Sequence, residues 1–271
     1  MELSDPAKLK AQKTYDAASD LFDARPLGFW ARYGERTVAR LALTPGASVL
    51  DVACGSGASA LPAAVAVGPR GRVIGVDLAE KLLTLAREKA RRQGLDNVEF
   101  RRADMTALGY PDGTFDAVVC VFGVFFVKDM EALTAELWRM VKPGGRLAIT
   151  TWGPRLFAPM YEKWNAAVRG LRPDLVTDFN PWDRITTPAA LRRLFVDAGI
   201  PDVEVTPETG SQRLDGPDDV WTVAAGSGFR WVIEQLGPDA ERLRREMGEW
   251  AQASRLAAIE TNVIYAVATR R

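Results

Sequence analysis

The fold is decided by the stretch Ser48-Val49-Leu50-Asp51-Val52-Ala53-Cys54-Gly55-Ser56-Gly57. Its apolar, β-branched run predicts a buried strand, and the glycine pair at its end predicts a tight turn into a helix. Glycine lets the backbone approach a ligand closely, and the first N–H groups of the helix point towards it. The spacing Gly55-x-Gly57-x-x-Ala60 also fits the dinucleotide fingerprint, which is a weak signal by itself.

Residues 49–152 alternate predicted strands with predicted helices. This alternation is typical of a doubly wound, Rossmann-like α/β fold with a parallel sheet and right-handed crossovers. Ligand-binding groups are then expected at the carboxyl ends of the strands. The strands are predicted at 49–52, 73–76, 98–102, 115–121 and 146–152, with a turn at 142–145 before the last of them.

The remaining segments are expected to complete one domain over residues 1–271. Two further strands, at 203–206 and 262–268, bring the predicted sheet to seven strands. The predicted parts are N-terminal helices that form a candidate lid (1–45), the cofactor-binding core (46–152), cap or substrate segments (153–186 and 210–259), and segments completing the sheet (187–209 and 260–271).

Composition argues against several classes of function. The chain has 271 residues, with 35 Lys and Arg against 35 Asp and Glu. A nucleic-acid-binding protein usually carries a basic excess, so no nucleic-acid partner is expected. No apolar run is long enough to span a bilayer, so no membrane partner is expected either. Cys54 and Cys120 lie in apolar runs and are expected to be reduced core thiols of a cytoplasmic protein.

The chain contains no histidine. This absence excludes a Ser-His-Asp hydrolase, a His-ligated zinc enzyme and a histidine general base. With only two cysteines, a structural zinc site is not expected, and no metal is predicted.

Acidic residues follow the predicted strands. Asp77 lies about twenty residues beyond the glycine pair, where such folds hold a ribose hydroxyl. Asp104-Met105 follows the third strand and offers an acceptor and a backbone N–H for an adenine edge. Beside the glycine turn, these acid-tipped strands predict a nucleoside ligand.

Together these motifs resemble the class I S-adenosylmethionine (SAM)-dependent methyltransferases, and most of all the small-molecule group similar to the enzymes of ubiquinone and menaquinone biosynthesis. The resemblance covers roughly Tyr15 to Trp152 and is weak beyond. The motifs that carry it are 49–57, Asp77, Ala103-Asp104-Met105, Phe115-Asp116-Ala117-Val118 and Val141-Lys142-Pro143-Gly144-Gly145.

The resemblance implies SAM as cofactor, S-adenosylhomocysteine (SAH) as product, and a set of cofactor-binding residues. In the family, such residues hold the amino-acid end, the ribose and adenine, and the sulfonium end. In that order, the implied residues are Asp51, Ala53, Gly55 and Gly57; then Asp77, Leu78, Asp104 and Met105; then Val121 and Phe122.

Aromatic residues in the segments around the predicted site indicate a planar or hydrophobic methyl acceptor, although each could instead pack the cap. A base is needed only for an acceptor that arrives protonated, and each candidate base could instead be structural. The candidate substrate-binding residues are Trp30, Phe126, Trp152, Trp164 and Trp182, and the candidate bases are Tyr15, Tyr161, Asp178 and Asp183.

The predicted function is methyl transfer from SAM to an O, N or C nucleophile of a small molecule, by a monomer or homodimer. One alternative is an NAD(P)-dependent oxidoreductase, against which the lack of histidine and of a Tyr-x-x-x-Lys pair argues. Another is a SAM-binding module without catalysis. Val121-Phe122-Gly123-Val124 stands where nucleic-acid amino-methyltransferases carry an Asn/Asp-Pro-Pro-Tyr/Phe motif, so that substrate class is not expected.

Overall fold

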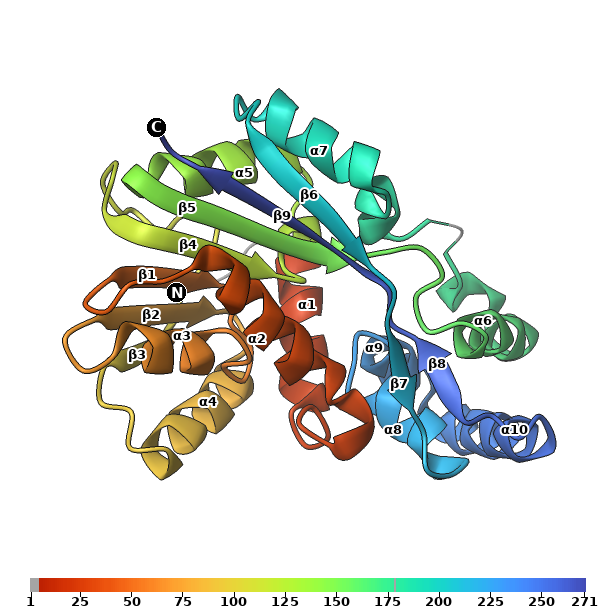
Figure 1. Cartoon of the computed structure of the whole chain (residues 1–271). Coiled ribbons are helices and arrows are strands. Elements are labelled where there is room, and N and C mark those ends of the chain that lie inside the picture. Colours follow the sequence, from red (N-terminus) through yellow and green to blue (C-terminus); the bar gives the residue numbers. More distant parts are fainter. Residues whose placement is uncertain (1–4, 178) are drawn as a thin grey trace.

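A seven-stranded sheet forms the centre of the computed structural model, which describes residues 5–177 and 179–271. The strand order is β3-β2-β1-β4-β5-β9-β6, and only β9 runs antiparallel to its neighbours. The doubly wound seven-stranded fold predicted from the sequence is therefore confirmed (Figure 1). The strands are β1 (Ser48–Val52), β2 (Arg72–Asp77), β3 (Val98–Arg102), β4 (Phe115–Val121), β5 (Val141–Trp152), β6 (Val203–Glu208) and β9 (Val263–Thr269).

Helices cover both faces of this sheet. On one face lie α2 (Phe29–Leu41), α3 (Ala60–Val67) and α4 (Glu80–Arg92), and on the other lie α5 (Met130–Arg139) and α7 (Pro188–Asp197). The start of α7 follows from local chemistry, because the Thr187 hydroxyl accepts a hydrogen bond from the Ala190 N–H and Pro188 occupies the first turn. Cys54 and Cys120 are free and buried, as predicted.

The predicted turn at 142–145 is wrong as a boundary, because β5 already begins at Val141. Pairing of β4 with β5 shifts register between Phe115 and Ala117, so the extra residues of β5 bulge out of the ladder. Gly144 at this bulge has a φ of +83°, a conformation that glycine adopts without strain.

The cap and the helix α1 (Pro6–Ala18) lie on the side to which the arrowheads of β1 and β2 point in Figure 1. The sequence analysis missed α9 and the two-stranded sheet of β7 with β8. Short 3-10 turns link the elements at Arg25–Leu27, Val124–Phe126, Pro173–Leu175, Pro181–Ile185 and Gly237–Asp239. The cap elements are α6 (Met160–Leu171), β7 (Ser211–Arg213), α8 (Asp218–Ala225), α9 (Arg230–Leu236), α10 (Ala240–Ala253) and β8 (Ala258–Glu260).

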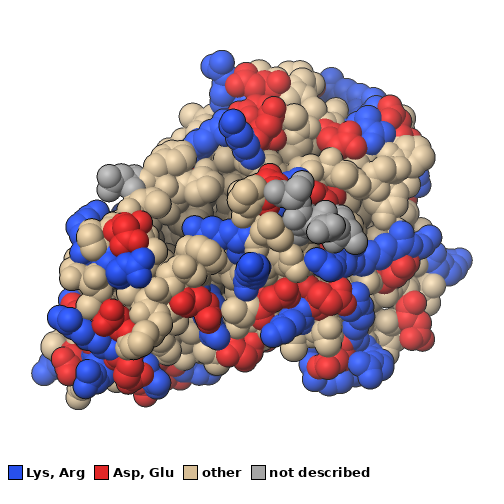
Figure 2. Space-filling model, turned by 180° about the vertical axis from the view of Figure 1, so that it is seen from behind, with Lys and Arg blue, Asp and Glu red and all other residues tan. Residues whose placement is uncertain are grey.

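Charged side chains of both signs intermingle on the face seen in Figure 2. That face therefore lacks the single basic stripe that marks a nucleic-acid footprint. Within residues 5–177 and 179–271, no helix combines the length and the apolar character needed to cross a membrane.

Candidate functional site

The glycine turn after β1 has the left-handed backbone conformation for which its glycines are suited. Left-handed φ angles occur at Ala53 (58°), Gly55 (52°) and Gly57 (88°). The Cys54 N–H donates to the Val76 carbonyl at 3.0 Å and so ties the turn to the end of β2. The turn thus presents its backbone at the carboxyl edge of the sheet, where ligands of such folds bind.

Asp51 in β1 is fully buried and only partly satisfied. Its Oδ2 accepts from the Ser59 hydroxyl at 2.7 Å, whereas Oδ1 has no hydrogen-bond partner among the described residues. Burial, with a smaller contribution from the charge of Asp77, raises the pKa of Asp51 to about 7. A buried carboxylate oxygen without a partner is costly, so the site is suited to a cationic ligand.

Asp77 at the end of β2 connects the glycine turn to α4. Its Oδ2 accepts from the Gly55 N–H at 2.8 Å, and its Oδ1 accepts from the Ala79 N–H at 2.9 Å. Burial raises the pKa of this carboxyl above its usual value, although these backbone hydrogen bonds oppose the shift. Each oxygen retains a lone pair that a ribose hydroxyl can use.

Asp104 after β3 is bound by the N-terminal helix. The Lys8 ammonium lies 2.7 Å from its Oδ2, and the Thr106 N–H donates to its Oδ1 at 2.9 Å. Burial alone would raise the pKa of Asp104, but the hydrogen bonds from Lys8 and Thr106 outweigh it and hold the pKa below its usual range. Lys8 was not among the predicted site residues, because nothing in the local sequence pairs positions so far apart.

The segment from residue 5 to residue 23, which we call the N-terminal arm, also touches the other strand ends. Asp16 accepts from the Lys81 N–H at 3.0 Å, and Asp23 accepts from the Ser56 hydroxyl at 2.7 Å. The Phe22 ring lies 3.6 Å from the point that a Cβ on Gly55 would occupy. The arm therefore covers the glycine turn and the ends of β2 and β3.

The five predicted substrate-binding aromatics belong to one continuous chain of ring contacts. Phe229, which the sequence analysis missed, links α6 to the rest of this chain. The contacts between ring centroids are Trp182–Phe125 5.8 Å, Phe125–Phe126 4.9 Å, Phe126–Tyr15 5.6 Å, Tyr15–Phe22 6.1 Å, Phe22–Trp30 5.2 Å, Trp30–Trp152 5.6 Å, Trp152–Phe157 5.7 Å, Phe157–Phe229 5.9 Å and Phe229–Trp164 5.2 Å.

These rings differ in accessibility. Trp164 is 1% exposed and stacks on Phe229 inside the cap, which suits a packing role. Trp30, Phe126 and Trp182 are partly exposed and are better placed to meet a ligand.

The residues expected near adenine and the sulfonium lie at the same edge of the sheet. Leu78, Met105 and Val121 are partly buried after β2, after β3 and at the end of β4. Phe122 has a left-handed φ of 54°, and its ring stacks on Trp152 with centroids 3.9 Å apart. The buried Phe122 side chain thus joins the aromatic chain to the hydrophobic core.

The candidate bases are held by structural contacts. Asp183 accepts from the Asn180 N–H at 2.7 Å and caps a 3-10 turn, while the Tyr161 hydroxyl accepts from the Asn180 side chain at 2.8 Å. Burial and the nearby charge of Asp77 raise the pKa of Tyr15 far above its usual value, so Tyr15 is a poor base near neutral pH. Asp178 lies outside the described residues.

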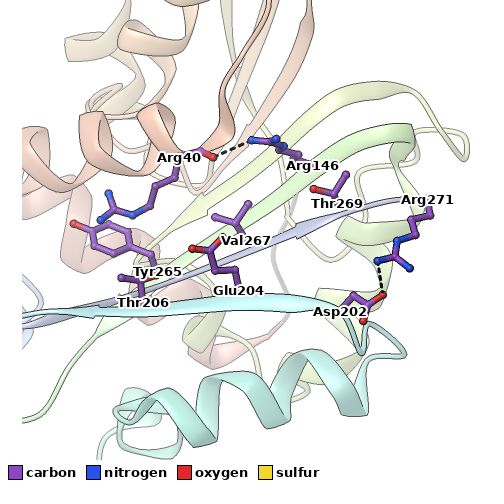
Figure 3. A pocket seen from close by; sticks show the side chains of 9 residues that line it. All are labelled: Arg40, Arg146, Asp202, Glu204, Thr206, Tyr265, Val267, Thr269 and Arg271. Carbon is purple, nitrogen blue, oxygen red and sulfur yellow. Dashed lines mark hydrogen bonds and ion pairs between the residues drawn. The ribbon is translucent and has the colours of Figure 1, made fainter.

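A separate hollow of about 460 Å³ lies where β6 and β9 extend beyond α2 (Figure 3). Its cations are already engaged: Arg146 donates to the carbonyl of Arg40, Arg40 stacks on Tyr265, and Arg271 pairs with Asp202. The hollow is remote from the carboxyl ends of β1 and β2, so we place the candidate site at the glycine turn.

A glycine turn with acids at the ends of three neighbouring parallel strands defines a nucleoside-binding α/β protein of the Rossmann-like class. A family model described as a methyltransferase domain matches residues 49–145. The chain is 31% identical over 174 residues to nocamycin O-methyltransferase of Saccharothrix syringae, an alignment that covers 62% of this chain and 61% of that enzyme. The chain thus spans about three fifths of that relative's length.

Longer coverage comes from a second relative. The chain is 31% identical over 209 residues to a demethylmenaquinone methyltransferase of Shouchella clausii, covering 73% of this chain and 88% of that protein. Among solved structures, the YcgJ protein of Bacillus subtilis shares the fold, with a TM-score of 0.58, 18% identity and coverage of 89% of this chain and 99% of that one. The chain belongs to the class I SAM-dependent methyltransferase family.

The residues present fit the cofactor of this family. The unpaired Oδ1 of Asp51 can accept from a cationic amine, and the glycines of the turn allow the backbone to approach the amino-acid end of the cofactor closely. Asp77 can accept from ribose hydroxyls while it keeps its bonds to the backbone. Asp104 can accept from an adenine amine once it shares or releases Lys8.

Proposed function

We propose that the protein transfers a methyl group from SAM to an O, N or C nucleophile of a small planar or apolar molecule. The observation that carries this proposal is the buried Oδ1 of Asp51, which has no hydrogen-bond partner among the described residues. Asp51 lies in β1, just before the glycine turn. A carboxylate at this place attracts the amine of SAM and repels the phosphates of a nicotinamide dinucleotide. It therefore favours the methyltransferase over the oxidoreductase alternative.

Positioning carries most of the chemistry in this proposal. When bound, SAM supplies a methyl group on a positively charged sulfur, which leaves as a neutral thioether once the acceptor's lone pair has taken the methyl group. No residue has to protonate such a leaving group, which is consistent with the absence of histidine. The raised pKa makes Tyr15 a poor base near neutral pH, so its role in this proposal is to help position the acceptor.

The acceptor class rests on the aromatic chain. Rings of Trp30, Phe126 and Trp182 offer faces and edges to a planar or apolar molecule. The two relatives are named as methyltransferases of nocamycin and of demethylmenaquinone. Both names point to small molecules, which supports a small-molecule acceptor here. We further propose a cytoplasmic monomer or homodimer, consistent with two free, buried cysteines.

Thermal unfolding with SAM, SAH or NADPH tests the cofactor. SAH at about 100 times its Kd should stabilise the fold by about 2.7 kcal/mol, which raises Tm by roughly 5–10 °C. NADPH should produce no shift. The opposite pattern, a shift with NADPH and none with SAM or SAH, would reject the proposed cofactor.

A transfer assay with labelled SAM over a panel of phenols, amines and carboxylates then separates an enzyme from a binding module. Asp77→Ala is the control, because it removes a ribose contact and should abolish SAH binding and transfer together. SAH binding without transfer to any member of the panel would favour the module.

A further inference from the structure

The indole nitrogen of Trp30 is buried and has no hydrogen-bond partner among the described residues. The ring stacks on Phe22, with centroids 5.2 Å apart and planes 5° apart. Phe29 and Phe122 approach the same indole at steeper angles, with centroids at 4.6 and 5.6 Å. These aromatic neighbours offer the N–H group only weak acceptors, because a ring face is a poor substitute for an oxygen.

Trp30 lies at the edge of the sheet where the proposed function places the methyl acceptor. It belongs to the first turn of α2 and contacts Trp152, the last residue of β5. Phe22 lies between Trp30 and the glycine turn, because its ring stacks on Trp30 and packs on Gly55. The acceptor has to reach the methyl group at this edge of the sheet, so its body falls among these rings.

A phenylalanine would fill much of this position without burying a polar atom. Leaving a buried donor unsatisfied costs stability, and such a donor in a folded protein calls for an explanation. The indole N–H is a donor only, so its partner must carry an acceptor atom. Because the flanking groups are aromatic, that partner is a flat molecule with a carbonyl or phenolic oxygen.

We propose that Trp30 is a specificity-determining residue, whose N–H donates a hydrogen bond to an oxygen of a conjugated or aromatic methyl acceptor. The inference deepens the proposed function and rests on it. Acceptors that lack an oxygen at this place leave the indole N–H unpaired and are discriminated against.

The test uses 1-tetralone and tetralin as probes, because they share a bicyclic frame and differ in one carbonyl oxygen. Both are titrated into SAH-loaded protein by calorimetry. We expect tetralone to bind roughly 5- to 100-fold more tightly than tetralin, and Trp30→Phe to abolish this preference. Trp221→Phe, the same change at a partly exposed cap residue, is the matched control and should keep it.

A spectroscopic measurement on the unmutated protein covers the case in which Trp30→Phe disturbs folding. In protein with 15N-labelled tryptophan, the indole cross-peak of Trp30 is the one lost in Trp30→Phe. Tetralone should move this peak downfield, whereas tetralin should not. The same downfield shift on SAH binding alone would mean that the cofactor carboxylate is the partner and would overturn the inference.

Two results of the calorimetry would also overturn the inference about Trp30. Tetralone could bind no better than tetralin, or its preference could survive in Trp30→Phe. Failure of the proposed function is distinguishable, because the protein would then either not bind SAH or bind it without methyl transfer to any member of the acceptor panel. SAH binding without a preference for the oxygen rejects only the role of Trp30.

Discussion

At the scale of single residues, we propose that Asp51 selects the ligand that the glycine turn holds. Its pKa is raised from 3.8 to about 7, so the free protein carries a proton there below neutral pH. The unfolded chain would lose that proton near pH 4. The contribution of this group to stability is therefore greatest below about pH 4 and falls as the pH rises towards 7.

We predict that SAH affinity depends on the ionisation of Asp51. The amine of the ligand is a cation through about pH 5.5 to 7.5, and the ionised carboxylate binds it best. The affinity should rise with pH, by up to about tenfold per unit, and level off above pH 7. Calorimetry across this range measures the effect.

Two variants control for this effect. Asp51→Asn should bind more weakly and without this pH dependence. Ser59→Ala removes the hydrogen bond to Oδ2 and should move the plateau to higher pH. An affinity of the unmutated protein that does not change with pH would contradict the assignment of the amine to Asp51.

At the scale of elements, α2 supports the glycine turn through a glycine of its own. A Cβ on Gly34 would lie 2.2 Å from the Ala58 carbonyl oxygen, so α2 packs directly on the backbone that follows Gly57. The sequence analysis did not single out Gly34, because a glycine inside a helix shows no local sign of what it touches. The strands were easier to predict, since their apolar runs and the turns between them are local patterns.

Replacing Gly34 by alanine should force α2 away from the turn. We expect a loss of about 3 kcal/mol in the free energy of unfolding, at the upper end of overpacking costs, together with weaker SAH binding. Urea denaturation and calorimetry measure the two effects.

Gly248→Ala is the matched helix substitution. Nothing lies within 4 Å of its added Cβ, so this variant should gain about 0.5–1 kcal/mol. Equal stabilities of the two alanine variants would show that the close approach of α2 is relaxed at little cost.

At the scale of the whole molecule, the N-terminal arm connects distant parts of the core. Lys8 reaches Asp104, Asp16 reaches Lys81, and Asp23 pairs with Lys89 at 2.9 Å. These contacts close the edge of the sheet at which the cofactor is expected. We propose that the arm acts as a lid, which opens for ligand entry and closes over the bound ligand.

Limited trypsin cleavage at Lys10 and Lys13 reports how often this lid opens. Lys8→Met removes a partly exposed ion pair, so we expect cleavage of the free protein to rise by roughly 1.5- to 5-fold. Saturating SAH should slow cleavage in both proteins, because it binds beneath the closed arm.

Lys163→Met is the control for the loss of one lysine. It breaks a comparable ion pair with Glu246 in the cap and should leave cleavage of the arm unchanged. Faster cleavage with SAH would show that the ligand displaces the arm.

The sequence by itself determined the alternation of strands and helices over residues 49–152, the glycine turn, and the three acids at the strand ends. These features are local: an apolar run specifies a buried strand, a left-handed turn calls for glycine, and parallel strands bring their carboxyl ends to one edge. Only the tertiary structure decided which residues meet at that edge. The pairing of Lys8 with Asp104, the packing of Gly34 on Ala58 and the unpaired N–H of Trp30 each depend on partners distant in the chain. A side chain carries no local signal of the partner that packing of the arm, α2 and the cap will bring to it.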